Sequence, residues 1–128
     1  MSRLNCFDHE KLDVYKVAIE FVILSSEMAE QLPRGKAYLA DQLQRASSSI
    51  PLNIAEGAGE FSGPEKCCFY RVAKRSATEC AGILDLCNQL DLVEETRHLK
   101  GRELLLRIVA MLTKMAQTCS NANERLPV

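Results

Sequence analysis

The stretch from Leu39 to Phe61, LADQLQRASSSIPLNIAEGAGEF, limits what this chain can fold into more than any other segment. Its apolar and small residues recur at steps of four and three, which places them along one side of an α-helix. Three serines, Pro51, and the polar residues Asn53 and Glu56 lie between them, so this helix would be weak on its own. We therefore expect other helices to pack closely against it. The recurring positions are Leu39, Leu43, Ala46, Ile50, Ile54, Gly57 and Phe61.

Three further segments show the same helical periodicity, and no alternation typical of strands competes with it. Turn residues separate the segments, with Pro33 and Gly35 after the first. Ser62, followed three residues later by Glu65, matches a capping box at the start of the third. The chain is therefore predicted to be one all-α domain over 1–128, with 1–7 and 120–128 flexible. We expect an antiparallel up-down-up-down four-helix bundle with helices at about 8–32, 36–59, 63–92 and 94–119.

The first predicted helix carries two apolar seams. The first seam consists of Leu12, Tyr15, Ile19, Val22, Ser26 and Ala29. The second seam consists of Val14, Val17, Phe21, Leu24 and Met28. One seam is enough to join a monomeric bundle, so the second seam predicts an oligomer contact. The alternative is the single wide apolar face of an ordinary core helix.

Composition and charge narrow the classes of function. The chain is 47% hydrophobic and 26% charged, as soluble globular proteins are, and its formal net charge is −1. This balance argues against a strongly basic nucleic-acid module. The charge is uneven, because residues 8–32 carry six acids and two bases, whereas residues 34–75 carry seven bases and four acids. A local basic face is therefore compatible with the sequence.

The six cysteines follow no pattern that indicates a metal site or a disulfide framework. There is no CxxC motif, and neither histidine is spaced to complete a zinc site. The first residues do not form a signal peptide, and no apolar run reaches the ~18 residues that a membrane span needs. We predict reduced core thiols in a cytoplasmic protein without membrane contact. Whether any cysteine is reactive stays open.

Basic side chains gather near the start of the third predicted helix. Positions 71, 74 and 75 are helical neighbours, and position 66 lies one to two turns before them. Such a strip can contact the phosphates of a nucleic acid. The alternative is an ordinary solvated face with surface ion pairs. The candidate nucleic-acid contacts are Lys66, Arg71, Lys74 and Arg75.

Asn53 and Glu56 could present an amide and a carboxylate to a ligand. A structural network is favoured instead, because a buried carboxylate must be paired. In that network Glu56 or Glu79 would meet Arg45, in the bundle or at a subunit contact, and Asn53 would bond across helices. Substitution of Asn53 by alanine is then expected to lower thermal stability or break the oligomer.

The side-chain inventory does not indicate catalysis. His9 and His98 stand near the starts of the first and last helices, apart from any plausible nucleophile or acid pair. The segment GAGEFSG lacks the lysine of a phosphate-binding loop. The prediction is a protein that is not an enzyme and that uses no cofactor and no metal.

The run DQLQRASSSIPLNIAEGAGEFSGPEK, followed by RVAKRSATE, resembles the signature of the four-helix bundle family of 23S rRNA intervening-sequence proteins, also called S23-type proteins. The opening LDVYKVAIEFV fits the first helix of that family, so the resemblance covers residues 12–112. It implies a bacterial helical bundle that assembles as a ring-like homopentamer, and it implies no established activity. Glu60 departs from the family pattern, where a basic residue is usual, and Arg75 stands where a glycine is usual.

The resemblance also suggests partners. Some family members are encoded within inserts in bacterial 23S rRNA genes. Distant relatives with the same fold are accessory proteins of diversity-generating retroelements, in which a basic pentamer binds a reverse transcriptase and nucleic acid. Two functions therefore stay open. One is an oligomeric bundle that binds RNA or a ribonucleoprotein, and the other is a protein–protein scaffold, for example an accessory subunit of a reverse transcriptase.

Overall fold

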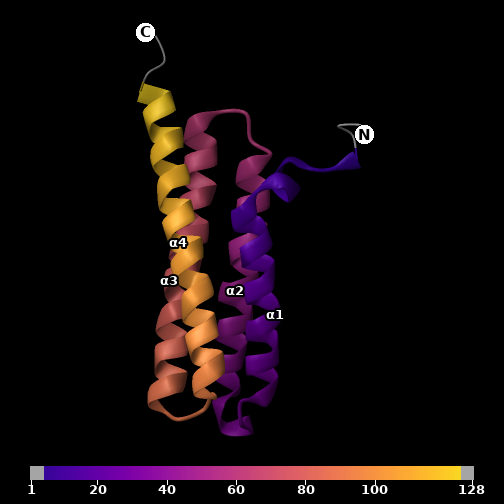
Figure 1. The fold of residues 1–128 in the computed structure, drawn as a ribbon, viewed down its shortest axis with the longest axis vertical. Helices are drawn as coiled ribbons and strands as arrows, with labels where there is room; N and C mark the ends of the chain where they lie inside the picture. The colour runs from indigo at the N-terminus through magenta and orange to yellow at the C-terminus, as the bar shows by residue number, and fades with distance from the viewer. Residues whose placement is uncertain (1–4, 125–128) are drawn as a thin grey trace.

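All four predicted helices are present in the computed structural model, which describes the backbone of residues 5–124 and the side-chain surroundings of residues 5–120. They run alternately down and up along one long axis (Figure 1). No strand occurs among residues 5–124, and within that range no helix is long and apolar enough to cross a membrane. The all-α fold is therefore confirmed. The helices are α1 (Asp13–Gln31), α2 (Ala37–Ala58), α3 (Gly63–Gln89) and α4 (Glu95–Glu124), with short 3-10 segments η2 (Asp8–Lys11) and η3 (Arg34–Lys36).

Two helix limits near the chain ends differ from the prediction. The first helix was expected from residue 8, but Leu12 is extended (φ −86°, ψ 127°), and it separates η2 from α1. The fourth helix was expected to end at residue 119, but α4 continues to Glu124. Residues 120–124 are therefore helical, and their flexibility stays a prediction, whereas residues 1–4 and 125–128 lie outside the described residues.

The third helix ends three residues before the predicted limit of 92 because Asp91 adopts the left-handed conformation (φ 58°). The Leu92 N–H donates to the Cys87 carbonyl at 2.9 Å, and the Asp91 N–H donates to the Asn88 carbonyl at 3.1 Å. These two bonds form a Schellman motif, which usually has glycine at the left-handed position. At the other end, the Ser62 hydroxyl accepts from the Glu65 N–H at 3.2 Å, as one half of a capping box requires.

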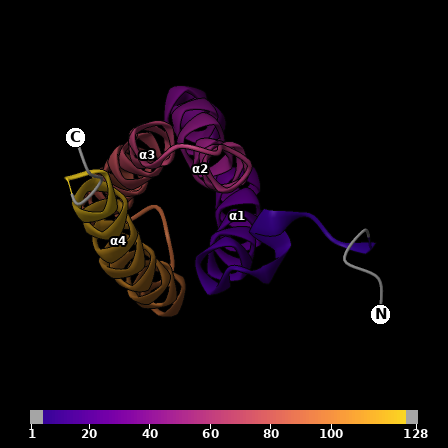
Figure 2. The ribbon, with the colours of Figure 1, turned by 90° about the horizontal axis from the view of Figure 1, so that it is seen from above.

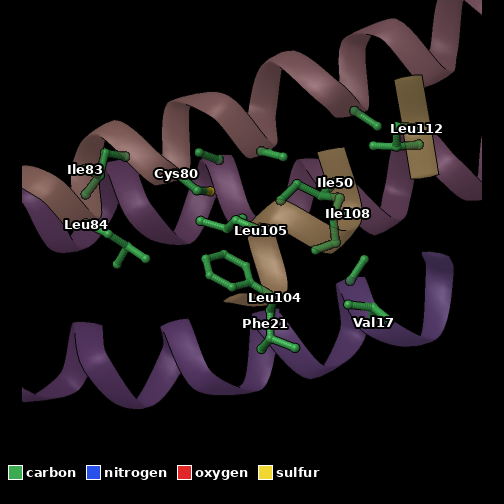
Figure 3. Close-up of a cluster of buried hydrophobic side chains, with 14 of the residues drawn as sticks. Val17, Phe21, Ile50, Cys80, Ile83, Leu84, Leu104, Leu105, Ile108 and Leu112 are labelled. Carbon is green, nitrogen blue, oxygen red and sulfur yellow. The ribbon is translucent and has the colours of Figure 1, made fainter. Parts of the chain in front are cut away.

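The core is aliphatic and lies along the bundle axis. Figure 3 shows Phe21 of α1, Leu84 of α3 and Leu104 of α4 converging in it. On α2, Leu43 and Ile50 are fully buried. The seam that recurs every three or four residues of α2 therefore faces inward as far as Gly57, as the periodicity predicts. The prediction is wrong for Phe61, which lies beyond the end of α2 and is fully exposed.

The second seam of α1 is the inner face of this helix. Val14, Val17, Phe21 and Met28 are at most 5% exposed, and the half-buried Leu24 packs against the core. The prediction that these five residues contact another subunit is therefore wrong, because their own bundle already covers them.

The first seam is divided, because Leu12 and Tyr15 are half-buried and pack against the core, whereas other members reach the surface. Ile19 is 37% exposed, and Tyr15, Val22 and Ser26 are half-buried, whereas Ala29 is buried. The second seam, and not the first, is therefore the main inner face of α1.

Seen from above, the helices follow one another around the bundle from α1 to α4 (Figure 2). At the end where α4 begins, α4 packs against α1. There Arg97 lies 3.6 Å from Glu27, and Lys100 lies 3.8 Å from Glu20. Toward the end of α4 the two helices separate, in both views (Figures 1 and 2). α2 and α3 stay close at that end, at Gly57, where a Cβ atom would lie 2.7 Å from Cε1 of Tyr70.

Candidate nucleic-acid interface

Three of the four predicted cations form a ridge on the outer side of α3. Arg71 and Arg75 are exposed, and Lys74 is half-buried. Helical spacing brings the three within one turn of each other. None of them forms an ion pair with a described side chain. The ridge is therefore a concentrated, unneutralised positive charge.

Shallow grooves flank this ridge on both sides. The groove of ≈ 440 Å³ is lined by Arg71 and Arg75 together with Cys68 and Ser120. The groove of ≈ 260 Å³ lies between α3 and α4 and is lined by Arg71, Lys74 and Ser120, with Thr113 and Gln117. Hydroxyl and amide groups thus stand beside the cations, and such groups commonly bond to phosphate and sugar oxygens.

Lys66 does not belong to this ridge. Its ammonium group donates to the carbonyl oxygens of Ala58 at 3.0 Å and Gly57 at 3.3 Å. These are the last carbonyls of α2, which lack partners within their own helix and attract a positive charge. Lys66 also lines a different groove, between α1 and α4. The structure thus corrects the prediction, because it gives Lys66 the role of a cap on α2 rather than a place beside Arg71.

The predicted polar network is also different from the observed one. Arg45, Glu56 and Glu79 are exposed, and no ion pair joins them within the described residues. Because they are exposed, water satisfies their charges, and the burial that would force pairing is missing. The prediction is therefore wrong for these three residues within the bundle, and a pairing at a subunit contact stays a prediction.

Asn53 does take part in a network with serines, but the predicted bond across helices is wrong, because both of its own hydrogen bonds stay within α2. Its amide donates to the Ser49 carbonyl at 2.8 Å and to the Ser49 hydroxyl at 3.0 Å. The Ser49 hydroxyl lies 2.8 Å from the hydroxyl of Ser76, which joins α2 to α3. Sequence reasoning missed both serines, although Ser76 gave a signal as a polar residue within an apolar seam of α3.

A second surface feature is a set of exposed apolar side chains on α1 and α2. Ile23 is 58% exposed on α1, beside the 37% exposed Ile19, and Leu52 is 61% exposed on α2. Large apolar side chains that gather on a surface are typical of an interaction site. The exposed side of α1, rather than its inner face, is therefore available to another subunit.

The cysteines are free, and most are shielded. Burial raises the pKa of Cys80 to about 12 and also raises the pKa of Cys87 and Cys119. These thiols stay protonated near neutral pH and are poor nucleophiles. The prediction of core thiols is wrong for Cys68, which is exposed.

The histidines stand apart from any nucleophile. The His9 ring packs against Tyr15 with centroids 4.6 Å apart, and His98 lies 3.8 Å from Asp85. Within the described residues no three potential ligands gather into a metal site.

These features define a class, a single four-helix bundle with a cationic ridge on one helix and an apolar outer face on another. The sequence model of the 23S rRNA-intervening sequence protein family matches residues 10–114, which is most of the chain. The chain therefore belongs to this family.

The fold is similar to that of a protein of unknown function from the S23 ribosomal protein family of Bacteroides thetaiotaomicron. The TM-score is 0.75 and the sequence identity 18%, and the match covers 81% of this chain and 95% of that one. At this identity the likeness concerns the fold alone. No curated protein matches the chain by sequence.

Proposed function

We propose that this protein is a non-enzymatic, self-associating helical bundle that binds RNA through Arg71, Lys74 and Arg75. The observation that carries the proposal is the ridge of three cations on α3 without an acidic partner among the described residues. Phosphate contacts supply most of the affinity in sequence-independent binding, and they require such unneutralised cations.

The distribution of acids supports this assignment. Residues 66–78 of α3 contain four basic residues and no acidic one. The acids of α1, by contrast, outnumber its single base, Lys16. A polyanion is therefore attracted to one side of the bundle although the net charge of the chain is −1.

Self-association would multiply the effect of a small ridge. One ridge offers three cations, which is few for tight binding, but several ridges on one assembly bind a single RNA with a high effective concentration. The exposed apolar side chains Ile19, Ile23 and Leu52 support such an assembly. By family resemblance, we propose a ring of five subunits.

The test is the affinity for a fluorescent single-stranded RNA at several salt concentrations. The family name makes a transcript of a 23S rRNA intervening sequence the first probe. The double variant Arg71→Glu/Arg75→Glu is expected to bind at least about tenfold more weakly, and its slope of log K against log salt should fall by ~0.7 for each lost phosphate contact.

A matched control changes the same amount of charge elsewhere. Lys16→Glu/Arg107→Glu alters two residues that line the space between α1 and α4, away from the ridge. This control should retain most of the affinity. Equal losses in the two double variants would show a general charge effect and no site on α3.

A protein–protein scaffold is the second candidate, for example an accessory subunit of a reverse transcriptase. Exposed leucines favour it, among them Leu86 and Leu90 on and after α3 and Leu99 and Leu106 on α4. A defined protein that co-purifies after nuclease treatment, together with background binding to RNA, would select this candidate.

A further inference from the structure

An apolar groove opens between α1 and α4 where the two helices separate (Figure 2), and the proposed RNA site does not use it. Its volume of ≈ 530 Å³ lies within the usual range of ligand pockets. Most of its lining is apolar, and two methionines make the wall adaptable. The apolar lining consists of Leu12, Val14, Tyr70, Met111, Met115 and Cys119.

The charged groups of this groove favour an anion. The Lys66 ammonium is held by two carbonyl oxygens, which leaves one of its three N–H donors for a ligand. Lys114, which is exposed, adds a second positive charge, and Asp13 on the α1 wall carries one negative charge. The groove thus has a net charge of +1, which one carboxylate neutralises. Burial raises the pKa of Tyr70, so its hydroxyl stays protonated near neutral pH.

The length of the groove sets the length of the apolar tail that a ligand can place in it. From Met111 to Cys119, α4 advances eight residues, or roughly 12 Å, which is the length of an extended tail of about ten carbons. We propose that this groove binds a medium-chain aliphatic carboxylate, with its carboxylate at Lys66 and Lys114 and its tail along Met111 and Met115.

The test is displacement of a dansylated undecanoic acid by dodecanoate, measured by fluorescence. The chain contains no tryptophan, so the probe signal is free of protein background. Dodecanoate should displace the probe below its micelle concentration, and dodecyltrimethylammonium, with an equal tail and the opposite charge, should need at least about tenfold more. Failure of dodecanoate to displace the probe, or equal displacement by the cationic surfactant, would overturn the proposal.

Two variants on α4 locate the site. Met115→Glu places a carboxylate in the apolar groove and should weaken dodecanoate binding at least about tenfold. Leu106→Glu makes the same change at an exposed position outside the groove and should leave dodecanoate binding unchanged. Equal effects of the two variants would contradict the assignment.

A third variant, Lys114→Met, keeps the test valid if Met115→Glu fails to fold. It should weaken binding of dodecanoate but not of dodecanol, and an equal effect on both ligands would overturn the proposal. RNA binding by these variants is expected to stay unchanged, which separates this proposal from the one on α3.

Discussion

At the scale of single residues, Gly57 shows how closely α2 and α3 approach. A Cβ atom there would lie 2.7 Å from Cε1 of Tyr70 and 3.0 Å from Cβ of Phe69. Gly57→Ala should therefore lower the free energy of unfolding by ~1–3 kcal/mol, because overpacking forces side chains and backbone to shift. Urea unfolding followed by circular dichroism measures this change.

Gly82 is the matched control within the same pair of helices. It is exposed in the middle of α3, and nothing lies within 4 Å of the position of its Cβ atom. Gly82→Ala should raise the free energy of unfolding by up to ~1 kcal/mol, since alanine is the better helix former. If the two alanine variants shifted stability in the same direction, the close contact of α2 with α3 would be refuted.

Glu60 gives a prediction about pH. Its pKa is raised above 4.5, first by a hydrogen bond with Glu65 and also by repulsion from the charges of Glu65 and Glu56. The folded state therefore binds the proton more tightly than the unfolded state does, and the stabilisation is present at low pH and lost as pH rises above 4.5.

The variant Glu60→Gln removes this titration. Its melting temperature relative to the wild type should be higher at pH 7 than at pH 4, with the difference growing as pH rises through the raised pKa. A melting-temperature difference that is constant from pH 4 to pH 7 would mean that Glu65 does not raise the pKa of Glu60.

At the scale of elements, the end of α3 depends on one strained residue. Asp91 holds a left-handed conformation that costs a residue with a Cβ atom more than it costs glycine. Asp91→Gly should thus raise the free energy of unfolding by about 0.5–1 kcal/mol. Asp85→Gly, inside the same helix, should lower it by about the same amount. If both glycine variants changed the free energy of unfolding in the same direction, the assigned helix end would be contradicted.

The sequence located the elements well, because each helix carries a repeat of apolar residues at steps of three and four. The sequence predicted the helix ends poorly where a helix stops at a residue type that does not usually end helices. A glycine stop would have been recognised, but Asp91 in a left-handed conformation and Leu12 in an extended one leave no comparable signal. The assignment of the α1 seams failed for another reason. Both seams are apolar, and which one faces inward depends on where α2 and α4 lie, which is a property of the assembled bundle.

The candidate site was predictable to a similar extent. Helical spacing grouped Arg71, Lys74 and Arg75 correctly, since three residues within one turn must share a surface. The same spacing could not show that Lys66 reaches back over the loop to the end of α2. The network around Asn53 was predicted with charged partners, but an interface between small residues brings hydroxyl groups into contact, and here Ser49 and Ser76 meet.

At the scale of the whole molecule, we propose that the exposed isoleucines of α1 form the contact between subunits. Ile19→Glu/Ile23→Glu should convert a larger species into a monomer of 14.3 kDa, because a subunit contact cannot bury two unpaired carboxylates. Light scattering after size-exclusion chromatography gives the mass directly. The control Leu99→Glu/Leu106→Glu changes two exposed leucines of α4 and should leave the mass unchanged. A monomeric wild type, or an assembly that survives both changes at α1, would refute the assigned interface.

Ultraviolet crosslinking in host cells is the sharpest test of the proposed RNA-binding ridge on α3. RNA attached to the protein would be sequenced, and the crosslinked peptides would be identified by mass spectrometry. We expect a defined, enriched RNA that is attached within residues 66–78 or to the facing residues of α4. This RNA should be lost in the Arg71→Glu/Arg75→Glu variant. RNA at background level on a protein with an intact fold and assembly would contradict RNA binding by this ridge.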